Sequence, residues 1–183
     1  HQGDHGQVAF TLVLRGWLAV LSGDWAEARA DLDRALALSR QADDVHLAFT
    51  QAMRAMLALV ENDRVACRAA GQEARALAET IGELQALRWA EHVLAELEVQ
   101  EGWAEAAVER LEPLLDRPGL QEYDVTALLP MLAWAYLEQG RLDEASATVA
   151  QALARARPGE MRLVLVEALR IQAMIALRQQ QWK

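Results

Sequence analysis

Apolar residues recur at helical spacing over most of the chain. Within residues 10–23, four of them occupy positions i, i+4, i+7 and i+11, which lie on one face of an α-helix. These are Phe10, Leu14, Trp17 and Leu21. Short polar phrases with glycine, asparagine or aspartate separate such stretches, as helix ends do. The pattern predicts an all-α chain of about nine helices, at 7–22, 25–41, 45–60, 64–81, 84–100, 103–116, 124–139, 142–156 and 160–180.

The pattern repeats with a period of about 39 residues. The phrase GDWAEA at 23–28 returns as EGWAEA at 101–106 and as GRLDEA at 140–145. Two columns of equivalent positions hold mostly small residues. One reads Gly16, Ala55, Leu94, Ala133 and, after a slightly longer step, Ala173; the other reads Ala28, Cys67, Ala106 and Ala145. Small side chains let two helices approach closely, so each unit is predicted to be a hairpin of antiparallel helices with buried small residues, Cys67 included.

Residues at the helix ends add detail to this prediction. Asp24 and Asp124 are expected to be N-caps, because their carboxylates can accept backbone N–H groups left free at a helix start. Pro113 and Pro130 fall inside periodic stretches, where a bend or a late helix start is expected. The tryptophan that begins two of the second helices, at 25 and 103, is expected to cover the end of its hairpin.

The repeated phrases resemble tetratricopeptide repeats, in which a small residue of the first helix is followed by G-D-[WY]-x-E-A at the turn. The best copies are GDWAEARADLDRALALSR at 23–40 and QGRLDEASATVAQALARA at 139–156. This resemblance extends over essentially the whole chain. It implies one α-solenoid domain, a right-handed superhelix with repeats at about 7–44, 45–82, 83–120 and 121–158, then the first helix of a fifth repeat in 159–183.

The repeat of 39 to 40 residues is longer than the tetratricopeptide length of about 34. Long units with phrases such as RGWLAVLSGDWAEARADLDRALALSR resemble the repeat region of MalT-type, LuxR-related bacterial transcription activators, which are signal-transducing ATPases. The resemblance implies an effector-sensing module that acts in transcription regulation and binds a small-molecule inducer or a regulatory protein or peptide. The sequence contains neither GxxxxGK[ST] nor an evident basic recognition helix. A general scaffold for protein–protein interaction or self-association is the alternative.

In stacked helix pairs, the first helices of successive repeats line the inner, concave face. Counting along these helices from the small column gives the candidate binding residues. They are Phe10, Val13, Trp17, Phe49, Met56, Arg88, Glu91 and Trp134. Indole rings suit stacking on sugars or peptides.

Each candidate residue also has a structural interpretation. The apolar residues can instead form core or subunit contacts, and the apolar first helix can mediate homo-oligomerisation. Arg88 and Glu91, at positions i and i+3 of one helix, can form a solvated ion pair.

The amino-acid composition and the motifs argue against several classes of function. The net charge of −9, with basic residues interspersed among acidic ones, argues against nucleic-acid binding by this segment. No apolar run reaches the ~18 residues of a membrane span, no signal peptide is evident, and a single cysteine cannot form an internal disulfide, so a cytoplasmic location is expected. No phosphate loop or converging ligand set is present, which predicts a non-enzyme without metal or cofactor.

Because His1 is not an initiator methionine and Trp182 stands where another helix should begin, a fragment of a longer protein is expected.

Overall fold

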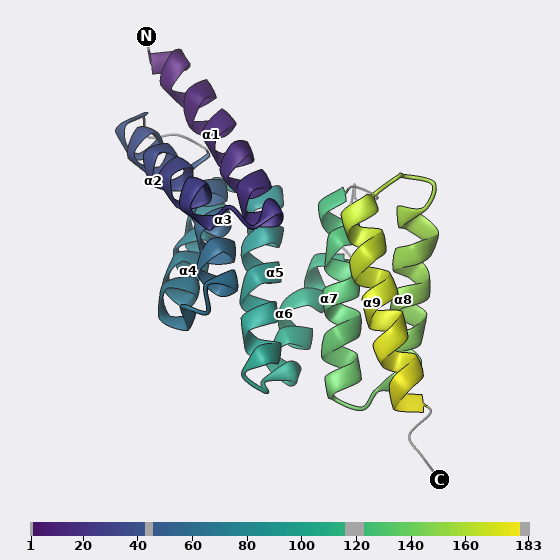
Figure 1. The fold of residues 1–183 in the computed structure, drawn as a ribbon. Helices are drawn as coiled ribbons and strands as arrows, with labels where there is room; N and C mark the ends of the chain where they lie inside the picture. The colour runs from purple at the N-terminus through teal and green to yellow at the C-terminus, as the bar shows by residue number, and fades with distance from the viewer. Residues whose placement is uncertain (1, 43–45, 116–122, 180–183) are drawn as a thin grey trace. The chain divides into compact units, whose positions relative to one another are not determined.

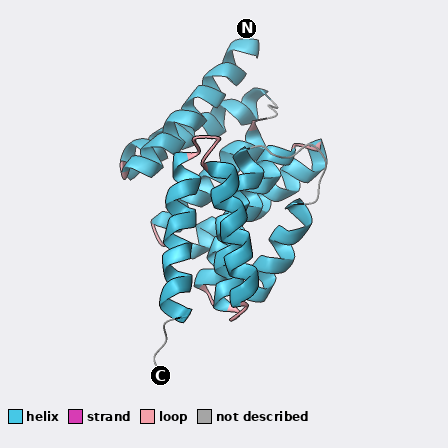
Figure 2. Ribbon diagram, turned by 90° about the vertical axis from the view of Figure 1, so that its right-hand side faces the viewer, coloured by secondary structure: helices cyan, strands magenta, loops and turns pink. Residues whose placement is uncertain are grey.

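The computed structural model describes residues 2–42, 46–115 and 123–179. These residues form nine α-helices and no strand, so the all-α prediction is confirmed for the part described (Figures 1 and 2). The helices are α1 (Gln2–Ser22), α2 (Trp25–Ala42), α3 (Leu47–Val60), α4 (Arg64–Ile81), α5 (Leu84–Gln100), α6 (Ala104–Leu115), α7 (Tyr123–Glu138), α8 (Leu142–Ala156) and α9 (Arg162–Gln179). The helix limits predicted at positions 45, 116 and 180, and the helix start predicted at Trp182, lie outside the described residues.

Helix ends follow local capping chemistry. Asp24 accepts the Glu27 backbone N–H at 3.1 Å, so its predicted capping role is confirmed, and Asp63 accepts the Ala66 N–H at 3.0 Å at the start of α4. The prediction for Asp124 is wrong, because α7 begins one residue earlier and this aspartate is a buried member of its first turn. Helices α6 and α7 continue through their prolines, so the late start considered for both does not occur.

The recurring turn phrase has a backbone reason. Gly23 has φ +82°, and Asn62, at the equivalent position of the next repeat, has φ +60°. One left-handed residue therefore follows both α1 and α3, a conformation that glycine and asparagine adopt more readily than other residues. The tryptophan after the turn does not cover the hairpin end as expected: Trp25 is exposed, and 65% of Trp103 is exposed.

The chain divides into two compact units, His1–Leu97 and Glu98–Lys183, with the boundary inside α5. In unit 1, α1 packs against α2 and α3, α2 against α3, and α3 against α4. Gly16 lies so close to α2 that an added Cβ would be 2.8 Å from Cγ of Leu32. Farther along, Cys67 of α4 is buried with Ala55 and Leu59, as the small columns predicted.

Unit 2 has the same kind of packing. Helix α6 contacts α7, α7 contacts α8, and α9 packs against both α7 and α8 (Figure 1). Ala133 of α7 and Ala145 of α8 are completely buried, which confirms these two members of the small columns. Two other members do not fit the prediction, because Ala106 of α6 is half-buried and Ala173 of α9 is exposed. In both units, consecutive helices pack against each other as antiparallel hairpins, the arrangement of an all-α helical repeat.

Candidate functional site

The first helices of unit 1 bring aromatic side chains together. The ring of Phe10 in α1 lies 4.8 Å from that of His46, just before α3, and 6.4 Å from that of Phe49 within α3. Phe10 is exposed, and the other two side chains are half-buried. Two residues predicted from the sequence therefore meet, and a histidine that the repeat pattern did not single out joins them.

A second aromatic group forms where α1 meets α5. Trp17 contacts Trp89 edge to face at 5.7 Å, and the Trp89 ring lies 5.9 Å from that of His92. Trp17 and His92 are half-buried, whereas Trp89 is buried beneath them. Because Phe10 and Trp17 are separated by two helical turns, they share one face of α1, about 10 Å apart along its axis.

These groups define what we call the unit 1 aromatic surface: Phe10, Trp17, His46, Phe49 and His92, supported by Trp89. Ring faces and edges of this kind can stack on planar or apolar groups, while indole and imidazole nitrogens form hydrogen bonds. The surface offers apolar contact with polar atoms interspersed, as a binding surface for a sugar or a peptide requires.

Two other predicted residues belong to the core of unit 1. Val13 is completely buried, and Met56 is half-buried against the cluster that contains Ala55, Leu59 and Cys67. Their burial supports the core interpretation of both side chains.

The interpretation of Arg88 and Glu91 as solvated side chains is wrong, because both are buried. Arg88 is only 2% exposed, and Glu91 is buried and pairs with Arg75 of α4 at 3.2 Å. The side chain of α5 that faces Trp17 is Trp89, one position beyond the predicted residue. One residue turns a helix by about 100°, so a one-residue error moves a side chain to a different face.

Trp134 of α7, in unit 2, already has partners within the protein. Its indole N–H donates to Glu138 at 3.3 Å, and the Arg170 guanidinium of α9 lies 5.0 Å from the ring centroid. Arg178 pairs with the same glutamate at 3.3 Å. A ligand that stacked on the ring face under Arg170 would have to displace this cation, so Trp17 is the better candidate of the two tryptophans.

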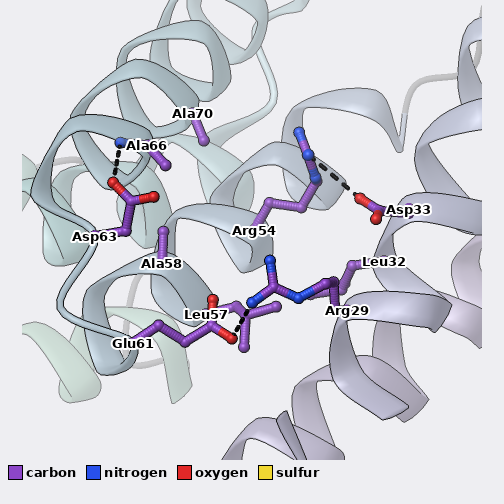
Figure 3. Close-up of a pocket in the computed structure, with 10 residues that line it drawn as sticks. All are labelled: Arg29, Leu32, Asp33, Arg54, Leu57, Ala58, Glu61, Asp63, Ala66 and Ala70. Carbon is purple, nitrogen blue, oxygen red and sulfur yellow. Dashed lines mark hydrogen bonds and ion pairs between the residues drawn. The ribbon is translucent and has the colours of Figure 1, made fainter. Parts of the chain in front are cut away.

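A pocket of about 140 Å³ opens between α2, α3 and α4 (Figure 3). Its charged rim is engaged internally: Arg29 pairs with Glu61, and Arg54 pairs with Asp33 at 3.3 Å. Asp63 is used as the α4 cap. Because small-molecule sites typically measure about 300–1,000 Å³, this pocket is too small for an inducer of ordinary size.

Tyr136 in α7 has a strongly perturbed hydroxyl. Burial, together with donation of its O–H to Glu112 at 2.6 Å, raises the pKa of Tyr136 to about 12. The Arg141 guanidinium lies over the ring at 4.3 Å. These contacts tie α6, α7 and the start of α8 together, so we assign this tyrosine a structural role.

The described residues contain no group of potential metal ligands, since no three histidine, cysteine or acidic side chains lie together so that they could hold a metal ion. Within the same part of the chain, no helix combines the length and apolar character that crossing a membrane requires.

Comparisons with protein-family models and with curated proteins gave no match to the chain. The class that the fold defines is an all-α helical repeat.

Proposed function

We propose that this chain is a ligand- or partner-binding repeat module that uses the unit 1 aromatic surface. The observation that carries the proposal is the junction of aromatic side chains from three first helices, with Phe10 and Trp17 still accessible at their outer edge. Side chains that served packing alone would gain most from complete burial. Aromatic groups left partly open at a helix junction favour a role in recognition.

In this proposal, the module is the effector-sensing region of a MalT-type, LuxR-related bacterial transcription activator. A ligand that contacts α1, α3 and α5 together stabilises the mutual packing of those helices. Such a ligand can shift an equilibrium between two conformations of the activator only by the difference between its affinities for them. The long repeat unit and its turn phrases support this assignment. Reading the flanking gene tests it: a phosphate-binding loop upstream and a helix-turn-helix segment downstream are expected, and a gene without either would contradict it.

Tryptophan fluorescence tests the aromatic surface directly. We expect one member of a panel of neutral oligosaccharides and aromatic peptides to shift the emission of the protein. Trp17→Phe should abolish most of the shift, because this indole lies at the surface. Trp25→Phe is the matched control, since it removes an exposed indole of the same unit at the start of α2. An equal loss in both variants, or no response to any compound, would refute the proposal.

Self-association through α1 is the second candidate. Val8, Leu18 and Leu21 expose large apolar side chains on this helix, and exposed apolar groups favour association. Sedimentation at high concentration checks the idea with Leu18→Ser and, separately, with Phe10→Ser combined with Phe49→Ser. A mass that is the same in wild type and variants would exclude self-association by this helix.

A further inference from the structure

The pocket between α2, α3 and α4 lies where the second hairpin differs from the others in sequence. Two alanines of α4 line it, Ala66 and Ala70. Longer polar side chains occupy the equivalent positions of the other second helices: Glu27 and Asp31 in α2, Glu105 and Glu109 in α6, and Glu144 and Thr148 in α8. Helix α4 therefore has only methyl groups at two positions where the other hairpins have larger polar groups.

In the first hairpin, these two positions supply carboxylates to an arginine. Arg15 of α1 donates to Asp31 of α2 through both Nε and Nη2, and its Nε lies 3.8 Å from Oε1 of Glu27. The Asp31 side chain is buried in this contact. The first hairpin thus contains its own acceptor for the arginine of its first helix.

Arg54 of α3 is the equivalent of Arg15 in the second hairpin, 39 residues later. It pairs through Nη2 with Asp33 of α2 at 3.3 Å, and it donates through Nη1 to Gln51 at 3.0 Å. Its Nε, the atom that Arg15 uses for Asp31, has no hydrogen-bond partner within the part of the chain that the structure describes. The pocket lies beside this guanidinium, where the acids of the first hairpin have no counterpart.

The walls of the pocket are largely apolar. Leu32, Leu57 and Ala58 line it together with the two alanines of α4 (Figure 3). Its volume of about 140 Å³ is close to that of an engineered protein cavity of about 150 Å³ that binds benzene. The space therefore accepts one small ring or a short branched chain, a group smaller than an inducer of ordinary size.

The donors that remain unused at the rim belong to arginines. Arg29 donates to Glu61 through Nη2, and its Nε and Nη1 have no other acceptor among the described residues. The rim acids are already engaged: Glu61 and Asp33 each pair with an arginine, and Asp63 caps α4, where the helix dipole offsets its charge. A carboxylate matches the geometry of a guanidinium and is the acceptor that these donors favour.

We propose that this pocket binds a small carboxylic acid whose body is one aromatic ring or a short branched aliphatic chain. The ligand carboxylate accepts from Nε of Arg54 and from Arg29, and it replaces the acid that α4 lacks. The apolar body lies against Leu57 and Ala58. This site shares no residue with the unit 1 aromatic surface, so it is a second site, independent of the one proposed above.

A ¹⁵N NMR titration of the full 183-residue chain tests the proposal, with benzoate and, separately, 3-methylbutanoate as probes. The Nε–H signal of Arg54, identified by its absence in Arg54→Lys, should shift in a saturable manner with at least one of the two acids. Benzamide has nearly the same shape as benzoate but no charge. It should bind about fivefold more weakly or not at all, because a charged acceptor forms the stronger hydrogen bonds with a guanidinium.

Ala70→Asp gives the second hairpin the carboxylate that Asp31 provides in the first. The new side chain should pair with Arg54 and weaken binding of the acid at least about tenfold. Ala66→Glu makes the same test at an exposed position, where the larger side chain does not disturb the core. Ala69→Asp is the matched control, since this exposed alanine of α4 does not line the pocket, and its affinity should equal that of the wild type. Circular dichroism should show the same helix content in all variants.

Loss of binding in Ala70→Asp and Ala66→Glu, with normal binding in Ala69→Asp, would support the site. The absence of a saturable shift with both acids would overturn the proposal, as would equal affinity for benzamide. Unchanged affinity in both Ala70→Asp and Ala66→Glu would overturn it as well. Trp17→Phe should bind the acid normally, so this titration and the fluorescence test of the aromatic surface can fail independently of each other.

Discussion

The close approach of α1 and α2 at Gly16 predicts that replacing this glycine with alanine has different effects on stability in two backgrounds. An alanine Cβ would lie 2.8 Å from Cγ and 3.0 Å from Cδ2 of Leu32. Leu32 is itself buried, and its Cγ is a branch point rather than a flexible tip. The leucine therefore cannot turn away without disturbing the core of unit 1.

Two effects of known size compete in Gly16→Ala. Alanine favours a helix over glycine by about 1 kcal/mol, which would stabilise α1. Overpacking a filled core costs roughly 1–3 kcal/mol. The sum is a change between neutrality and a destabilisation of about 2 kcal/mol. In a Leu32→Ala background the clash is absent, so Gly16→Ala should stabilise the protein by about 1 kcal/mol.

Urea unfolding followed by circular dichroism measures the free energy of unfolding of the four proteins in this double-mutant cycle. Leu32→Ala alone should be destabilising by about 2–5 kcal/mol, because it removes a buried aliphatic side chain. The coupling energy between the two sites should reach at least about 1 kcal/mol. If Gly16→Ala stabilised both backgrounds equally, propensity alone would explain it, and the close helix crossing would be refuted.

Three other predictions follow from the contacts described. In a spectrophotometric titration, Tyr136 should ionise with a midpoint near pH 12, because burial and its hydrogen bond to Glu112 raise its pKa. Since the folded pKa lies above the ordinary value of 10.0, the free energy of unfolding should fall between about pH 10 and 12, and Tyr136→Phe should weaken that fall. An unchanged alkaline stability profile in Tyr136→Phe would contradict this prediction. Asp63→Ala should lower the free energy of unfolding by about 0.5–2 kcal/mol in urea titration, because it removes the α4 cap, and Asp63→Asn should restore most of the loss. Arg110→Met should lower the free energy of unfolding by on the order of 3 kcal/mol, because it leaves Glu98 buried without the guanidinium that donates to it at 2.9 Å. A loss below about 1 kcal/mol in thermal or urea unfolding would show that the pair behaves as a surface salt bridge.

The helix ends were well predicted because they depend on neighbours in the chain. The ranges 64–81, 84–100 and 142–156 agree with the structure at both ends. Hydrophobic periodicity, turn residues and caps all act within a few residues, so they can be read from a local stretch. The burial of Cys67 was predictable for a related reason, since the repeat aligned it with alanines that need close packing.

Helix rotation was decided by tertiary packing. In α5, the repeat register indicated Arg88 as the side chain on the binding face, whereas the structure buries it and places Trp89 against Trp17. Glu91 likewise pairs with Arg75 from the preceding helix, a contact that the spacing within α5 could not indicate. Such choices depend on side chains from elements far apart in sequence, whose shapes must fit together, and no local pattern contains that information.

The sequence by itself thus determined the helices and the small residues buried where α1 meets α2, α3 meets α4 and α7 meets α8. These features follow from short-range chemistry that recurs along the chain. Only the tertiary structure decided which face of each helix is covered. Helix α9 shows the difference most clearly: Ile171 and Ile175 are buried, whereas Val166 and Leu177, which are also apolar, are exposed. Burial of a side chain requires a neighbouring element at the right place, and only the assembled fold specifies where such neighbours lie.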